Sequence, residues 1–263
     1  MRILTLVKQV PDSNATIKIK PDGSDIDSAG VKFVPDPFDE FGVELAIQLR
    51  EKKADVAEIV ALTLGPDKAA EALRVALAMG ADSAIHINDP EFESKNELFA
   101  ASVIAEAVKK DPDGFDLIVC GKFTIDLDAG AIGPALAEFL DLPHVGAVQG
   151  LDLTPDGKGF VARRRIEGAE EVVECQLPAV LTIEKGLVEA RYPSLPNLMK
   201  AKKKPVKVLT SRDLTVDAAL KAGTDFEAIS PPPPRPACTF VEGEPKDMAR
   251  DLVRLLREEA KVI

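Results

Sequence analysis

The sequence has few of the residues that usually carry metal or thiol chemistry. Its 263 residues include three cysteines, two histidines, one tyrosine and no tryptophan. Cys120, Cys175 and Cys238 lie far apart with no Cys-x-x-Cys pair, and His86 and His144 have no neighbouring ligand pattern. The sequence therefore argues against a disulfide framework and against a metal site.

Long hydrophobic runs and a positive net charge are also lacking. No apolar run approaches the roughly 20 residues that a membrane-spanning helix needs, and residues 1–8 are too short and too early for a signal peptide. The formal net charge of −11 argues against general nucleic-acid binding. A hydrophobic content of 46% is ample for a packed core. We expect a globular cytoplasmic protein without membrane insertion or nucleic-acid partners.

The first 150 residues alternate short apolar runs with helical patterns. This alternation is typical of an α/β fold, an open, mostly parallel sheet with helices on both faces. Strands are expected at 3–7, 58–64, 83–87, 117–120 and 145–148. Helices are expected from Asp36-Pro37 onward and at 67–79, 96–110 and 131–140.

The pattern changes after Gly150, where residues 151–177 predict a β-hairpin insertion and 179–183 a strand that could return to the sheet. We place the α/β domain at 1–204 and a C-terminal arm at 205–263. The arm contains a proline-rich spacer at 231–236 and a helix at about 245–261 with one apolar stripe. Because the stiff spacer places that stripe away from its own domain, we expect it to pack on a partner subunit; packing on its own domain is the alternative.

One segment combines apolar residues with a lysine cluster in this acidic chain. Its two prolines and asparagine favour irregular structure, and lysines follow within two helical turns. An exposed apolar tip beside like charges suits transient capture of acidic partners, whereas a buried loop before a solvated helix is the alternative. The candidate docking residues are Arg191, Tyr192, Pro193, Ser194, Leu195, Pro196, Asn197, Leu198, Met199, Lys200, Lys202, Lys203 and Lys204.

A loop with three glycines at 121–133 lies between an expected strand and its helix. Ligands of open parallel sheets bind beyond the carboxyl ends of the strands, and the backbone amides of such a loop suit an anion. By itself the loop matches no phosphate-binding motif, so a plain connection is the alternative. The segments 36–39 and 64–66 follow other strands and would meet the loop at one rim.

The chain resembles the β subunit of electron transfer flavoproteins. The resemblance rests on Glu189, on the 191–204 segment with its Leu-Pro-Asn and Met-Lys-Ala-Lys-Lys-Lys runs, and on Lys8-Gln9-Val10-Pro11-Asp12. It implies an adenine-nucleotide α-hydrolase-like fold and an obligate heterodimer with an α subunit that holds most of the FAD. It also implies structural AMP in this chain, flavin dehydrogenases such as acyl-CoA dehydrogenases as electron donors, and a quinone reductase as acceptor.

The resemblance further implies the nucleotide-site residues. It assigns backbone amides of the second half of the loop to phosphate, Asp39 or Asp126 to the ribose, and Phe38 to packing. The full set is Leu6, Asp36, Pro37, Phe38, Asp39, Leu64, Gly121, Lys122, Phe123, Thr124, Ile125, Asp126, Leu127, Asp128, Ala129, Gly130, Ala131 and Ile132. No residue is assigned a catalytic role, because no nucleophile–base pair or pair of poised carboxylates is present.

Three alternatives stay open. One branch of the family holds a second FAD in place of AMP and splits electron pairs, and residues 8–12 with Gly133-Pro134 favour it, while Leu127 and Ala131 depart from common patterns. A stand-alone nucleotide sensor of the universal-stress type would need neither the lysine cluster nor the arm. An ATP-using ligase-like enzyme would carry a Ser/Gly-rich loop directly after the first strand, where this chain has residues 8–12 instead.

Overall fold

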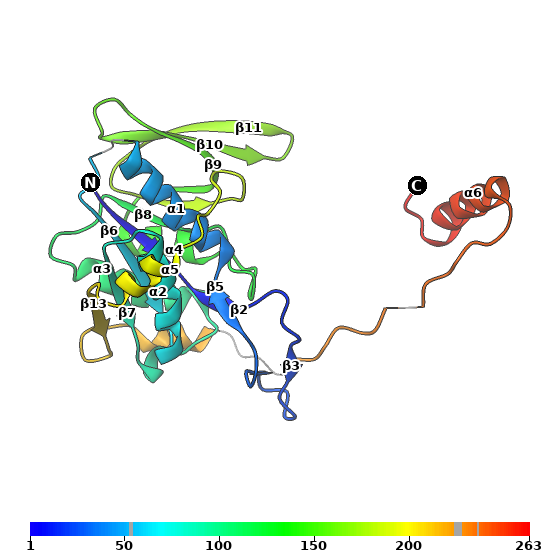
Figure 1. Cartoon of the computed structure of the whole chain (residues 1–263), viewed down its shortest axis with the longest axis horizontal. Coiled ribbons are helices and arrows are strands. Elements are labelled where there is room, and N and C mark those ends of the chain that lie inside the picture. The colour runs from blue at the N-terminus through cyan, green and yellow to red at the C-terminus, as the bar shows by residue number, and fades with distance from the viewer. Residues whose placement is uncertain (53–54, 224–227, 236) are drawn as a thin grey trace.

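A nine-stranded sheet forms the centre of the protein in this computed structural model, which describes residues 1–52, 55–223, 228–235 and 237–263. In sheet order the strands are β11 (Ala169–Gln176), β10 (Gly159–Ile166), β9 (His144–Leu153), β12 (Ala179–Ile183), β8 (Leu117–Gly121), β1 (Arg2–Leu6), β6 (Glu58–Leu64), β7 (Ser83–Ile87) and β13 (Val206–Leu209). Neighbouring strands from β9 to β13 are parallel, and β10 and β11 extend β9 as an antiparallel hairpin at the top of Figure 1.

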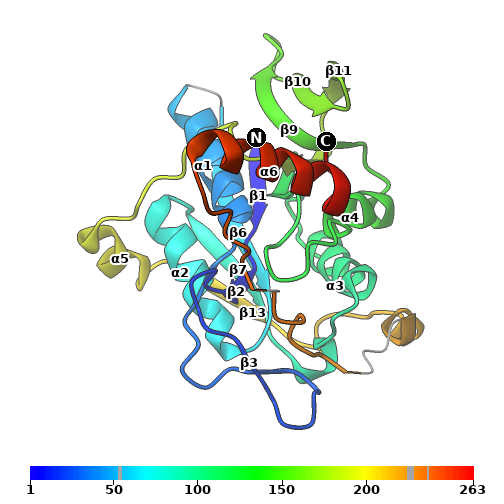
Figure 2. The same ribbon diagram turned by 90° about the vertical axis from the view of Figure 1, so that its right-hand side faces the viewer.

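Helices cover both faces of this sheet, as Figure 2 shows. They are α1 (Pro37–Glu51), α2 (Ala70–Met79) after the short turn η1 (Asp67–Ala69), α3 (Glu97–Lys109) after η2 (Pro90–Phe92), and α4 (Ile132–Leu140). On one face α1 and α2 bury Val43 and Leu73, and on the other α3 and α4 bury Phe99 and Leu136. Both apolar layers stabilise the fold by removing side chains from water. The expected α/β class with a mostly parallel sheet is confirmed.

Strongly patterned elements have the expected bounds. The strands expected at 58–64 and 83–87 are β6 and β7 as observed. Helix α1 begins where expected, because the Asp36 side chain accepts a hydrogen bond from the Phe38 amide and Pro37 occupies the first helical position. The strand expected at 145–148 is longer in the structure, because β9 extends to Leu153. Gly146 and Gly150 weaken the strand pattern in the sequence, so the full length was not expected.

Several short elements were not expected. The pairs β2 (Gln9–Pro11) with β5 (Phe33–Pro35) and β3 (Lys18–Ile19) with β4 (Ile26–Asp27) occupy the stretch between β1 and α1. Strand β13 pairs with β7, so the sheet extends past the expected domain boundary after residue 204. The turn η3 (Ala218–Gly223) follows it. The division into domain and arm otherwise stays a prediction.

The docking segment was expected to be irregular, but its middle forms helix α5 (Leu195–Ala201), which lies beside α2. The Ser194 hydroxyl caps α5 by accepting a hydrogen bond from the Asn197 amide at 3.4 Å. Pro196 lies in the first turn, where its missing N–H leaves no bond unmade. The proline that predicted a loop therefore starts a helix.

The C-terminal arm extends away from the sheet in Figure 1. Pro231 to Pro234 form extended chain, whereas Pro236 of the predicted spacer lies outside the described residues. The terminal helix α6 (Pro245–Arg254) continues in the π-helical turn η4 (Leu255–Glu259), so it ends before the expected residue 261, and none of its residues is buried. In the part of the chain that the structure describes, no helix is long and apolar enough to cross a membrane.

Candidate functional site

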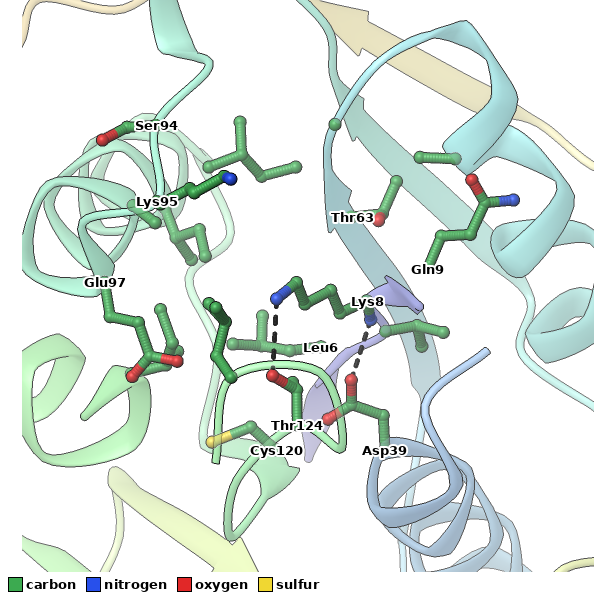
Figure 3. A pocket seen from close by; sticks show the side chains of 18 of the residues that line it. Leu6, Lys8, Gln9, Asp39, Thr63, Ser94, Lys95, Glu97, Cys120 and Thr124 are labelled. Atoms are coloured by element: carbon green, nitrogen blue, oxygen red, sulfur yellow. Dashed lines mark hydrogen bonds between the residues drawn. The ribbon is translucent and has the colours of Figure 1, made fainter. Parts of the chain in front are cut away.

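A cavity of about 540 Å³ lies at the carboxyl ends of β1, β6 and β8 (Figure 3). Among the predicted nucleotide-site residues, those that line it are Leu6, Asp39, Leu64, Gly121, Lys122, Phe123, Thr124, Leu127, Gly130 and Ile132. Those that do not line it are Asp36, Pro37, Phe38, Ile125, Asp126, Asp128, Ala129 and Ala131. The structure thus brings the predicted segments to one rim. Residues 64–66 all line the cavity, whereas only part of the 36–39 and 121–132 segments does.

Two buried carboxylates at the start of α1 hold the loop after β8. Asp36 accepts hydrogen bonds from the amides of Phe38 at 2.9 Å and Ile125 at 2.7 Å. Asp39 accepts from the amides of Lys8 and Gly121, both at 2.8 Å. Both acids therefore fix the backbone around the cavity. Each Asp39 oxygen has one amide donor and room for a second, and the contact of Asp39 with a ribose stays a prediction.

Burial shifts the pKa values of these two acids. Burial raises the pKa of Asp39 to about 7, and the neighbouring charge of Asp36 acts in the same direction. Burial also raises the pKa of Asp36, although the amides of Ile125 and Phe38 oppose the shift. The loop after β8 therefore rests on carboxylates that are costly to ionise together.

Lys8 brings a positive charge to the cavity wall. Its Nζ lies 2.8 Å from an oxygen of Asp126 and 3.4 Å from the Thr124 hydroxyl, as Figure 3 shows for Thr124. Asp126 is therefore the ion-pair partner of a lysine, and its ribose contact stays a prediction. In the sequence, Lys8 was recognised only as part of a family motif, and its place in the cavity wall was not predicted.

Glycine permits the close approach of α1 to the end of β8. A Cβ atom on Gly121 would lie 2.6 Å from the Phe38 Cβ and 3.0 Å from an oxygen of Asp39. The Phe38 ring packs against Phe123 with ring centroids 4.5 Å apart, in keeping with the packing role expected for it. Any larger residue at 121 would push the end of β8 away from the start of α1, which carries Asp36 and Asp39.

The second half of the loop offers backbone donors. Gly130 has a φ of +67°, and a Cβ there would lie 3.1 Å from the Lys122 carbonyl oxygen. Within the described ranges, the amides of Gly130 and Ile132 donate to no protein acceptor, and both residues line the cavity. The intervening Ala131 amide donates to a carboxylate oxygen of Glu97 at 2.8 Å. These amides start α4 and suit an anion.

Several cavity residues were missed in the sequence. They are Lys8, Gln9, Asp25, Thr63, Lys95 and Glu97. Thr63 is buried, and its hydroxyl has no hydrogen-bond partner in the described part of the chain, although buried hydroxyls are normally paired. Thr63 precedes Leu64, a predicted site residue on β6, and this position is the only sequence signal for Thr63. An unpaired hydroxyl in a cavity wall fits a ligand with polar edges.

The docking segment presents apolar side chains beside lysines. Tyr192, Leu195 and Met199 are 98%, 74% and 59% exposed, and Lys200, Lys202 and Lys203 are exposed next to them. Exposed large apolar side chains grouped with one sign of charge are typical of interaction surfaces. The buried-loop alternative does not fit these exposed side chains.

Arg191 ties this segment to α1. Its guanidinium donates to Glu44 at 2.7 and 3.0 Å and to Glu51 at 2.8 and 2.9 Å. Hydrogen bonds to Glu51 and Glu44 raise the pKa of Arg191, so the anchor keeps its charge. Arg191 is therefore an anchor of the docking segment, not part of its exposed tip.

Lys204 also departs from the expected exposed cluster. Its half-buried ammonium donates to the carbonyl oxygens of Leu77 and Ala81 near the end of α2, and burial lowers its pKa. A cation at the C-terminal end of a helix satisfies carbonyl groups that have no partner within the helix. Lys204 therefore stabilises the fold at α2.

Replacing Lys204 with methionine is expected to lower the free energy of unfolding by about 1–2 kcal/mol, because two carbonyl groups lose a charged donor. Chemical denaturation of the full-length chain measures this change. Lys202→Met removes the same charge from an exposed position and should change stability by less than about 0.5 kcal/mol. Equal effects of the two substitutions would contradict the assignment of Lys204 to the fold.

The fold and the site together define a class of protein. Parallel strands whose carboxyl ends open on a ligand-sized cavity, beside a glycine-containing loop that starts a helix, are typical of α/β proteins that bind small molecules at this edge. No three His, Cys, Asp or Glu side chains of the described residues gather in a way that could hold a metal ion.

Comparison with known proteins gives the family. The electron transfer flavoprotein domain matches residues 25–214. The whole chain is 38% identical to electron transfer flavoprotein subunit beta of Bacillus subtilis, covering 100% of that protein, and 38% identical to that of Homo sapiens, covering 99%. The mitochondrial subunit beta of Oryza sativa subsp. japonica is 36% identical over 100% of both chains. The chain therefore belongs to the family of electron transfer flavoprotein β subunits, which serve electron transport.

Proposed function

We propose that this chain is the small subunit of a heterodimeric electron carrier, in which the α subunit holds most of the FAD and this chain binds AMP. The cavity at the carboxyl ends of β1, β6 and β8 is the observation that supports the nucleotide site. Its residues fit a mononucleotide, because Gly130 and Ile132 offer amides for a phosphate and Thr63 offers a hydroxyl. Bound FAD would supply the electron-accepting chemistry.

The chain itself contributes positioning. Asp36 and Asp39 hold the loop around the nucleotide, and Lys8 places positive charge at the wall where a phosphate-bearing ligand would lie. Arg191 and Ser194 hold the docking segment. We therefore assign the chain no catalysis of its own.

The docking segment is proposed to capture electron-transfer partners. Leu195 would enter an apolar recess of the partner, while Lys200, Lys202 and Lys203 attract acidic side chains around it. Donors of this kind would be flavin dehydrogenases such as the acyl-CoA dehydrogenases of fatty acid oxidation, and the acceptor a quinone reductase. A small apolar anchor with surrounding charge suits brief encounters, because the charge raises the association rate without holding the complex for long.

The C-terminal arm is proposed to pack on the α subunit. Met248, Leu252 and Val253 on α6 are 37%, 49% and 45% exposed. An amphipathic helix gains stability mainly by burying its apolar face against another element. β subunits of this family pair with an α subunit. We propose that this α subunit covers the apolar face of α6.

The test is to co-express the chain with the α subunit encoded beside it, purify the complex, and quantify FAD and AMP after acid release. One FAD and one AMP per heterodimer is the expected result. Two FAD and no AMP would instead support electron bifurcation, the alternative favoured by residues 8–12 and Gly133-Pro134. AMP in a chain that forms no complex with the α subunit would support a stand-alone nucleotide sensor.

A further inference from the structure

Glu97 places a carboxylate where the proposed site would hold a phosphate. It is the first residue of α3, half-buried, and Figure 3 shows its side chain projecting from α3 toward the cavity. Its Oε2 accepts a hydrogen bond from the Ala131 amide at 2.8 Å. Ala131 lies between Gly130 and Ile132, whose amides line the same cavity. One side chain of the protein therefore already uses the anion-binding end of the loop.

Three lysines line the cavity, and each has a carboxylate other than Glu97 as an ion-pair partner; Lys95 lies 3.0 Å from Asp25. Lys8 pairs with Asp126 at 2.8 Å, and Lys122 pairs with Glu184 at 2.8 Å. Two anions cannot share one amide donor, and like charges a few ångströms apart repel strongly away from bulk water. A phosphate that binds the Ala131 amide together with the Gly130 and Ile132 amides must therefore displace Glu97.

We propose that Glu97 acts as an internal stand-in for the ligand phosphate and so determines how tightly the site binds phosphorylated ligands. The proposal rests on the proposed nucleotide site and adds a competing group to it. Glu97 keeps the Ala131 amide paired while the site has no ligand. A phosphate breaks the Glu97–Ala131 hydrogen bond before it forms its own, whereas an uncharged nucleoside does not.

The test compares AMP with adenosine by calorimetric titration of the nucleotide-free full-length chain. Glu97→Gln removes the charge and is expected to raise AMP affinity by about tenfold, because a charge-assisted hydrogen bond no longer has to be broken. Adenosine affinity should change by less than about twofold. Unchanged adenosine binding also shows that the variant is folded, and Glu97→Ala repeats the test without any side-chain acceptor.

Glu93→Gln is the matched control, because Glu93 lines the cavity but has no hydrogen bond to the loop. Glu93→Gln should raise AMP affinity by less than about threefold, because it acts only through long-range, screened electrostatics. Lower or unchanged AMP affinity in Glu97→Gln would overturn the proposal, as would an equal gain in Glu93→Gln. If neither ligand binds any variant, the nucleotide site itself is wrong; if wild type binds AMP without the expected gain in Glu97→Gln, only the role of Glu97 is wrong.

Discussion

Replacing Leu195 with alanine is expected to slow electron transfer from a cognate flavin dehydrogenase by at least about tenfold, because truncating a central apolar anchor typically costs 2 kcal/mol or more. The side chain is 74% exposed at the start of α5. The flavin content should stay intact. Stopped-flow measurement of the second-order rate at low partner concentration gives the effect.

Val208→Ala is the matched control, because Val208 is 54% exposed on β13, outside the docking segment. It removes a comparable apolar side chain and should leave the rate unchanged. Loss of flavin in Leu195→Ala with unchanged transfer per flavin would contradict the docking role. Equal slowing in both variants would show that general surface hydrophobicity matters and that the segment is not specific.

The large effect expected at Leu195 depends on the anchoring of the segment. Arg191 makes paired hydrogen bonds to Glu44, which is buried on α1, and to Glu51. Ser194 then caps α5, so the backbone before and after the tip is already fixed. A partner pays less ordering entropy when it binds such a segment than when it binds a loose loop. The exposed tip is therefore a pre-formed surface.

The sequence predicted those parts of the fold that repeat a strong local pattern. Strands β6 and β7 are mostly apolar runs and were found with their bounds, and Asp36-Pro37 is a local start signal that located the beginning of α1. The pairs β2–β5 and β3–β4 have two or three residues a strand, too few to show a period of two. Helix α5 was missed because proline favours both a loop and the first helical turn.

The candidate site was predicted by segment but not by contact. The βα connections and the family resemblance located the 36–39 and 121–132 segments at one rim. Which atoms face the cavity depends on hydrogen bonds between distant residues, such as Asp36 to the Ile125 amide and Glu97 to the Ala131 amide. No local pattern encodes such pairs. For this reason the partial burial of Lys204 and the position of Glu97 were missed, and the ribose role of Asp39 stays a prediction.

The second large effect is a loss of stability as pH rises. Burial and the charge of Asp36 raise the pKa of Asp39 to about 7, whereas an unfolded aspartate has a pKa near 3.8. A raised carboxyl pKa means that the folded state holds the proton over this interval, so its stabilising effect is complete below about pH 4 and is lost as pH rises through about 7. Burial, with Asp36, also raises the pKa of Glu40 to about 6, which adds to the same loss. The Asp39 contribution is at most about 4 kcal/mol.

The measurement is the free energy of unfolding of the full-length chain between pH 4 and 8. His144 acts in the opposite direction, because burial and then the charge of Arg164 lower its pKa, so its neutral form favours folding as pH rises. The difference between wild type and Asp36→Asn removes that common term. Asparagine at 36 keeps an oxygen that accepts an amide hydrogen bond but carries no charge.

In Asp36→Asn the pKa of Asp39 should fall, so the loss of stability moves to lower pH and the two profiles diverge most between about pH 5 and 7. Asp22→Asn is the control, because it removes a charge from an exposed turn outside α1. It should leave the pH dependence of the free energy of unfolding unchanged between pH 4 and 8. A flat difference between wild type and Asp36→Asn would contradict the coupling of the two acids. Because Asp39 lines the cavity, its negative charge repels a phosphate once it ionises, so nucleotide affinity should weaken over the same pH interval as stability does. Asp36 and Asp39 thus couple the stability of the fold to the affinity of the site for its ligand.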